Sequence, residues 1–160
     1  GNHVTLHAGV VIGADGFGFQ LQEDHLEKIP HIGTVVVSDD VEIFPITNIA
    51  RGCLGNTTIG TGTKLDALVH IGHNSRLGSH TAVAAQVGLA GGAALGSYIQ
   101  IGGQAGIADI EIGDFTRVAS KAGVTKDIPA KSVISGFPAQ SHREELKLQA
   151  FIRRQMRSHT

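Results

Sequence analysis

The stretch IGTGTKLDALVHIGHNSRLGSHTAVAAQVGLAGGAALGSYIQIGGQAGI, residues 59–107, repeats one pattern every six positions. An aliphatic residue recurs at each sixth place and is usually followed by a small or acidic residue. These aliphatic positions are Ile59, Leu65, Ile71, Leu77, Val83, Leu89, Leu95, Ile101 and Ile107. An unbroken run of this length indicates that a six-residue unit organises the fold.

A period of six matches neither the 3.6-residue period of a helix nor the alternation of a half-buried strand. It is typical of hexapeptide repeats, which form parallel β-helices. Each hexapeptide is expected to supply a short strand and a corner, with its aliphatic side chain pointing inward. Three hexapeptides then complete one triangular coil, and coils stack about 4.8 Å apart. Ladders of inward side chains along the stack supply the hydrophobic core that a single repeat lacks.

The same series continues on both sides of this stretch, with informative breaks. The further aliphatic positions are Leu6, Ile12, Val37, Ile43, Ile49, Ile112, Val118 and Val124. A long excursion that carries Phe17 and Phe19 separates Ile12 from Val37. A smaller bulge of four extra residues precedes Ile59, and one residue is missing before Ile112. Insertions in solenoids project as loops, often on the binding face.

The repeat predicts an all-β fold, and its breaks predict the domain boundaries. We expect a parallel β-helix domain over residues 1–136 with a loop insertion at 14–36, followed by a C-terminal extension at 137–160. Within the extension, Ser141 and Glu144 form the pattern of a capping box, which predicts an α-helix. The apolar side of this helix, which includes Phe151, must pack on the end of the solenoid or on symmetry mates.

Composition excludes several classes of function. The net charge is −1 and no basic block stands out, so a nucleic-acid partner is not expected. Cys53 is the single cysteine, which rules out an internal disulfide framework and fits a reducing compartment. No apolar run approaches the roughly 18 residues that a membrane span requires.

Five segments resemble one family of hexapeptide-repeat enzymes, the UDP-3-O-(3-hydroxyacyl)glucosamine N-acyltransferases, or LpxD family, of lipid A biosynthesis. The segments are GADGFGF (13–19), KIPHIG (28–33), DALVHIGHN (66–74), QVGLAGGAALGSYIQIGGQAGIA (86–108) and GVTKDIP with SGFPA (123–139). The resemblance implies a left-handed β-helix and a cytoplasmic homotrimer with active sites between subunits. It also implies that no cofactor is bound. The donor would be the phosphopantetheine thioester of acyl carrier protein, and the acceptor would be the amine of a UDP-linked glucosamine derivative.

The chain also departs from the family pattern. The family's N-terminal domain, which helps to hold the uracil, is expected to be missing here. Ala50 stands where the family has an acid, and Asp109 lies near the place of a second family histidine.

The resemblance and the coil spacing together indicate three candidate site residues. His73 matches the family's catalytic base, and a neutral imidazole suits removal of a proton from an amine at cellular pH. Gly91 follows His73 by three hexapeptides, which places it one coil above His73, where its N–H can receive a developing oxyanion. Asp66 matches a family acid, and our hypothesis is that the Asp66 of a neighbouring subunit binds the sugar or orients the base. The alternatives are a corner histidine, a corner glycine and a solvated acid.

Two geometric arguments concern how Asp66 could reach His73 and whether the histidines could bind a metal. Seven residues of extended chain span roughly 23 Å at about 3.3 Å per residue, so Asp66 is expected to reach His73 only from a neighbouring subunit. His70 precedes His73 by three positions, but the histidine spacings do not match those of zinc-binding hexapeptide trimers. We therefore expect no metal site.

Two other functions remain open at this point. An enzyme of the same fold could use acetyl-CoA and another small acceptor. The chain could also be a catalytically silent trimeric scaffold.

Overall fold

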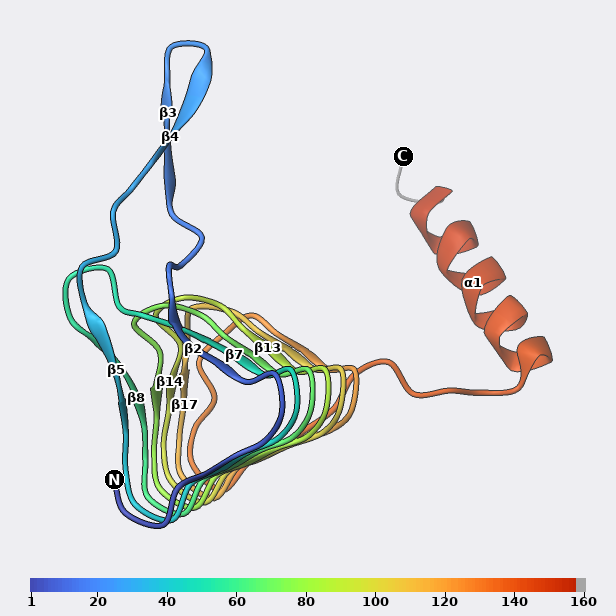
Figure 1. Cartoon of the computed structure of the whole chain (residues 1–160). Coiled ribbons are helices and arrows are strands. Elements are labelled where there is room, and N and C mark those ends of the chain that lie inside the picture. The colour runs from blue at the N-terminus through green and yellow to red at the C-terminus, as the bar shows by residue number, and fades with distance from the viewer. Residues whose placement is uncertain (158–160) are drawn as a thin grey trace.

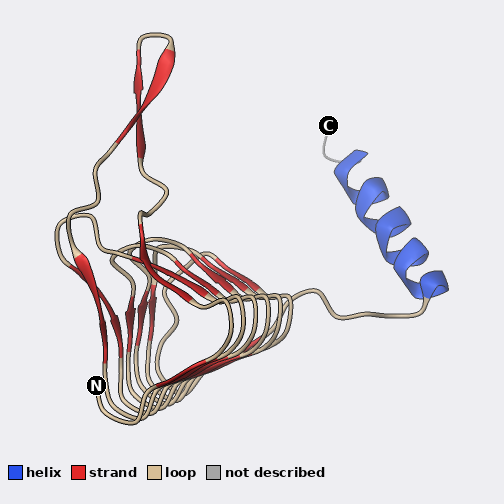
Figure 2. Cartoon of the chain, in the orientation of Figure 1, coloured by secondary structure: helices blue, strands red, loops and turns tan. Residues whose placement is uncertain are grey.

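A computed structural model describes residues 1–157 as a triangular solenoid of parallel strands, with one projecting hairpin and one helix (Figures 1 and 2). The first coil lies nearest the viewer in Figure 1. From it the chain passes anticlockwise around the axis as it recedes, which is a left-handed sense of winding. The predicted left-handed parallel β-helix is therefore confirmed. None of the described helices has the length and apolar character needed to cross a lipid bilayer.

Three parallel sheets form the sides of the solenoid, and successive strands of each sheet come from successive coils. Sheet I contains β1 (Thr5–Leu6), β6 (Glu42–Ile43), β9 (Lys64–Leu65), β12 (Ala82–Val83), β15 (Gln100–Ile101), β18 (Arg117–Val118) and β20 (Val133–Ile134). Sheet II contains β2 (Val11–Ala14), β7 (Asn48–Ala50), β10 (His70–Ile71), β13 (Gly88–Leu89), β16 (Gly106–Ile107) and β19 (Gly123–Val124). Sheet III contains β5 (Thr34–Val37), β8 (Asn56–Ile59), β11 (Arg76–Leu77), β14 (Ala94–Leu95) and β17 (Glu111–Ile112).

The strand register follows the six-residue period. Ile71 of β10 pairs with Leu89 of β13, which follows it by three hexapeptides. Leu77 pairs with Leu95 at the same separation. Inward aliphatic residues from all three sheets are buried in one continuous hydrophobic core. The hexapeptide period thus predicts both the coil length and the residues of the core.

The irregularities of the repeat have the expected structural outcome. The four extra residues before Ile59 form a bulge between β7 and β8, which lengthens that coil, and Ile71 still pairs with Ile49. The missing residue before Ile112 shortens a later coil, and Leu95 still pairs with Ile112. Both irregularities lie outside the strands and leave the parallel pairing intact.

Residues with positive φ turn the corners, and most of them are not glycine. Leu68 and Gln86 lie one coil apart, with φ values of 61° and 62°. The N–H of each donates to a carbonyl of the preceding coil, Leu68 to Pro45 and Gln86 to Ala67. These hydrogen bonds offset the steric cost of the left-handed conformation, which is about 1–2 kcal/mol for a residue with a Cβ.

The hairpin of β3 (Phe19–Gln22) and β4 (His25–Lys28) projects from the early coils of the solenoid (Figure 1). It lies within the expected insertion at 14–36, and the last residues of that range belong to β5. At its base, Lys28 Nζ donates a hydrogen bond to Asp15. Arg51 Nε lies 3.8 Å from the same carboxylate and donates to the Gly13 carbonyl at 2.7 Å. The hydrogen bond and charge of Lys28 lower the pKa of Asp15 below its ordinary range.

Helix α1 (His142–Arg157) stands apart from the coils at the end of an extended linker (Figure 1). The predicted capping box is present, because Glu144 N–H donates to Ser141 Oγ and Ser141 N–H donates to Glu144 Oε2. Phe151 is 59 % exposed and Ile152 is 47 % exposed, so this part of the apolar side is not buried against the solenoid of its own chain. The last residues of the expected extension, 158–160, lie outside the described residues.

We expect Leu89→Asp to unfold the protein. Leu89 is 1 % exposed and lies in an unbroken inward ladder between Ile71 and Ile107. An unpaired buried carboxylate costs several kcal/mol, which is comparable with the whole stability of a small domain. Circular dichroism and thermal melting measure the effect, with Arg76→Asp on the exposed side of β11 as the control. A soluble Leu89→Asp protein with an unchanged β-type spectrum would contradict the assigned register.

Lys28→Gln is expected to raise the pKa of Asp15 toward its ordinary value of 3.8. Because folding lowers this pKa, the ionic contact contributes stability at pH values above the ordinary range. That contribution is lost as the pH falls through the lowered pKa. An NMR titration of the Asp15 carboxyl group in wild type, Lys28→Gln and the control Lys126→Gln measures the shift. An identical midpoint in all three proteins would show that Lys28 does not hold the base of the hairpin.

Candidate active site

His73 lies at the corner between sheets II and III, just after β10. Its carbonyl accepts a hydrogen bond of 2.8 Å from the N–H of Gly92, one coil later. The next residue, Asn74, turns the corner with a φ of 61°. Asn74 N–H donates to Thr57 Oγ1 at 2.9 Å, which ties the corner to the preceding coil. The backbone that carries His73 is therefore fixed from both sides.

Asn74 also sets the proton position on the His73 ring. The backbone N–H of Cys53 donates to Asn74 Oδ1 at 2.9 Å, which identifies that atom as the amide oxygen. The same oxygen lies 3.0 Å from His73 Nδ1, and an amide oxygen only accepts hydrogen bonds. Nδ1 of a neutral His73 therefore carries the proton, and Nε2 keeps a free lone pair.

Gly91 packs on the face of the His73 ring beside Nε2, at the separation of one coil that the sequence predicts. A Cβ atom built on Gly91 would lie 2.5 Å from His73 Nε2, so glycine leaves the space that the ring occupies. The N–H of Gly91 makes no hydrogen bond within residues 1–157. A base nitrogen and an unused backbone donor thus meet at one corner, which is the combination that acyl transfer requires.

The projecting loop closes the other side of the His73 ring. His31 packs edge-to-face against His73, with ring centroids 5.0 Å apart and planes at 73°. A Cβ atom built on Gly16 would lie 2.6 Å from His31 Nε2 and 2.8 Å from His73 Cδ2. Sequence reasoning assigned no role to Gly16, His31 or Asn74. The signal was present, because GADGFGF, KIPHIG and DALVHIGHN all belong to the segments that carry the family resemblance.

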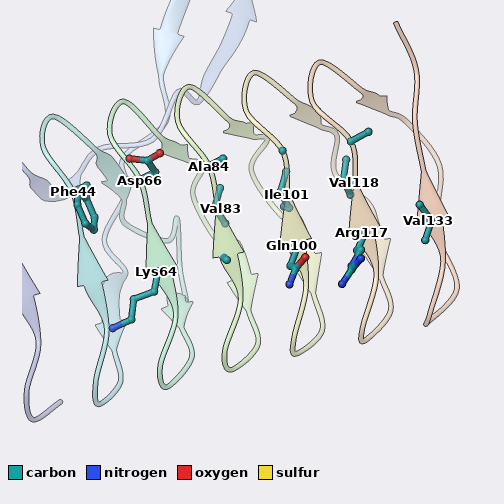
Figure 3. A pocket seen from close by; sticks show the side chains of 13 residues that line it. Phe44, Lys64, Asp66, Val83, Ala84, Gln100, Ile101, Arg117, Val118 and Val133 are labelled. Atoms are coloured by element: carbon teal, nitrogen blue, oxygen red, sulfur yellow. The ribbon is translucent and has the colours of Figure 1, made fainter. Parts of the chain in front are cut away.

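Asp66 lies at a different corner, between sheets I and II. One of its carboxylate oxygens accepts from Ala67 N–H at 2.7 Å, and the other accepts from Ala85 N–H at 3.1 Å. Within one chain the structure does not bring Asp66 to His73. Asp66 instead borders a groove on the outer face of sheet I, together with Lys64, Gln100 and Arg117 (Figure 3).

The remaining polar candidates are placed as follows. His70 lies in β10 with an exposed side chain, before the corner. The carboxylate of Asp109 lies against Gly92, so it extends the same corner by one coil above Gly91. No group of three His, Cys, Asp or Glu side chains in the described part of the chain is arranged to hold a metal ion.

Two curated proteins show extensive sequence similarity to this chain. UDP-3-O-acylglucosamine N-acyltransferase of Wolinella succinogenes is 46 % identical over 160 residues, covering 98 % of this chain and 50 % of that protein. UDP-3-O-acylglucosamine N-acyltransferase 1 of Gloeobacter violaceus is 48 % identical over 151 residues, covering 94 % of this chain and 43 % of that protein. The chain therefore spans about half the length of the curated relatives that it matches.

The fold is similar to that of a solved acyltransferase. UDP-N-acetylglucosamine O-acyltransferase from Moraxella catarrhalis superposes with a TM-score of 0.75 at 27 % identity, over 92 % of this chain and 57 % of that one. No family model matches the sequence. Over its own length, the chain is thus a homologue of the UDP-3-O-acylglucosamine N-acyltransferases and shares the fold of the hexapeptide-repeat acyltransferases.

Proposed function

We propose that this chain carries the catalytic corner of an N-acyltransferase of lipid A biosynthesis. The acyl group, a 3-hydroxyacyl chain, passes from the phosphopantetheine thioester of acyl carrier protein to the amine of a UDP-linked glucosamine derivative in the cytoplasm. The observation that carries the proposal is that Gly91 packs on the His73 ring, whose Nε2 keeps its lone pair. The names of the relatives support the acceptor, since they act on a UDP-3-O-acylglucosamine.

The corner supports a two-step acyl transfer. The amine nitrogen attacks the thioester carbonyl carbon while His73 Nε2 takes a proton from that nitrogen. The electron pair of the carbonyl moves to oxygen, and Gly91 N–H donates a hydrogen bond to the oxyanion. Collapse of the tetrahedral intermediate then breaks the carbon–sulfur bond. The departing thiolate receives the proton from His73, which leaves an amide, a free thiol and a neutral histidine.

Asp66 takes part in this proposal as a residue of a neighbouring subunit. Its corner is separate from that of His73 in one chain, and it lies at the edge of the exposed groove on sheet I (Figure 3). In a homotrimer, the Asp66 of one subunit faces the His73 corner of the next and binds the sugar or orients the base. The incompletely covered apolar side of α1 also favours association of several copies.

One chain has a mass of 16.7 kDa. We expect light scattering at micromolar concentration to give about three times this mass. Association covers the groove on sheet I and the apolar side of α1, which soluble monomers rarely leave open. A measured mass equal to that of one chain would contradict any site formed between subunits. It would also contradict the proposed role of Asp66.

His73→Ala is expected to lower turnover by roughly 10²–10⁴-fold, the usual loss when a general base is removed. His70→Ala is the matched control, because His70 lies on the same strand but before the corner. We expect it to lose less than about tenfold. Both variants are assayed with an acyl-carrier-protein thioester and a UDP-amino sugar, and their melting temperatures are compared with wild type.

The same assay separates the competing functions. Turnover by the wild type with acyl carrier protein but not with acetyl-CoA supports the proposal. The reverse result identifies an acetyltransferase. Absence of turnover with either donor, from a folded trimer, identifies a silent scaffold. Near-normal activity of His73→Ala would show that this histidine is not the base.

A further inference from the structure

His31 contributes a second, buried histidine ring to the candidate site. It is 6 % exposed, and its Nε2 atom has no hydrogen-bond partner. Among the side chains of residues 1–156, it holds the single buried nitrogen or oxygen in this condition. A phenyl or aliphatic side chain would fill the same space without burying an unpaired acceptor. The presence of an imidazole at this position therefore requires an explanation beyond packing.

The contacts of His31 define its proton position and the direction of its dipole. Nδ1 lies 2.9 Å from the carbonyl oxygen of Ile29, which only accepts hydrogen bonds. Nδ1 of the neutral ring therefore carries the proton, and the lone pair is on Nε2. A Cβ atom built on Gly16 would lie close to both His31 Nε2 and His73 Cδ2, so these two atoms face the same small space. The negative end of the imidazole dipole thus lies on the side of His31 that approaches His73.

We propose that His31 is a positioning residue for His73, an inference that rests on the proposed function. Its edge-to-face contact holds the His73 ring against Gly91, and the glycine at position 16 leaves room for both rings. The lone pair on its Nε2 favours the positively charged form of His73 that exists after the amine proton has been taken. No bond to His31 forms or breaks in the reaction.

This role predicts an effect on the chemical step rather than on substrate binding. His31 is buried within its own chain, so it contacts His73 and the loop rather than the substrate. An interaction that strengthens only when His73 becomes charged changes kcat and leaves KM nearly constant. A residue that merely supported the fold would instead lower the melting temperature and the fraction of active protein.

Three variants test the proposal in the full chain. His31→Phe keeps a ring and removes the acceptor, and we expect it to lower kcat about tenfold with KM within about twofold. His31→Gln restores an acceptor, and its kcat is expected within about threefold of wild type. His25→Phe is the matched control on the same loop, since His25 is exposed and pairs with Asp24, and it is expected to behave as wild type. Unchanged kcat in His31→Phe, or no recovery in His31→Gln, would overturn the proposal.

A measurement that does not require turnover separates failure of this inference from failure of the proposed function. Nitrogen-15 NMR of labelled histidine reports which ring nitrogen of His73 carries the proton. We expect one tautomer in the wild type, protonated at Nδ1, and a mixture in folded His31→Ala, whose His73 ring is free to turn away from Asn74. Identical spectra of wild type and His31→Ala would refute positioning by His31 whether or not the wild-type protein is active.

Discussion

Backbone hydrogen bonds between successive coils are the constraint on which the rest of this structure depends. Gly72 N–H donates to the carbonyl of Leu89 at 3.0 Å, and Ala90 N–H donates to that of Ile107 at 2.8 Å. Bonds of this kind recur along all three sheets, so each residue is placed above the residue one coil earlier. The inward aliphatic side chains then form ladders whose burial favours the stacked state, by about 25 cal/mol for each Å² of apolar surface removed from water. Because the coils stack regularly, the number of residues between two positions determines where they lie relative to each other.

The candidate site is a direct consequence of this stacking. His73, Gly91 and Gly92 meet because they occupy the same corner in consecutive coils, and Asp109 continues the corner one coil further. A rigid corner suits an oxyanion donor, since its N–H group does not need to reorganise during the reaction. The aperiodic loop adds what the repeat cannot provide, a second imidazole that covers the His73 ring. Asp15 and Lys28 hold the base of this loop.

The features of the fold that follow the period could be predicted from sequence, and those that depend on the path of the loop could not. The spacing of Ile71 and Leu89 specifies their pairing, and the same arithmetic places Gly91 against His73. The contact between His31 and His73 joins residues far apart in the chain through a hairpin that follows no repeat. The position of the proton on His73 depends on Cys53, whose N–H identifies the amide oxygen of Asn74. Neither feature follows from the six-residue period. The separation of Asp66 from His73 was predictable, because a corner and extended chain lie between them.

The central claim is that coil stacking presses the backbone of Gly91 against the ring of His73. The most direct test compares the NMR signals of His73 Cδ2 and Cε1 in Gly91→Ala and Gly88→Ala. A Cβ at Gly91 would collide with His73 Nε2, whereas a Cβ at Gly88 meets open space in the same coil. The account predicts that Gly91→Ala shifts both ring signals and that Gly88→Ala leaves them at their wild-type positions. Wild-type ring signals in Gly91→Ala would contradict the account, because they would show that Gly91 does not lie against His73.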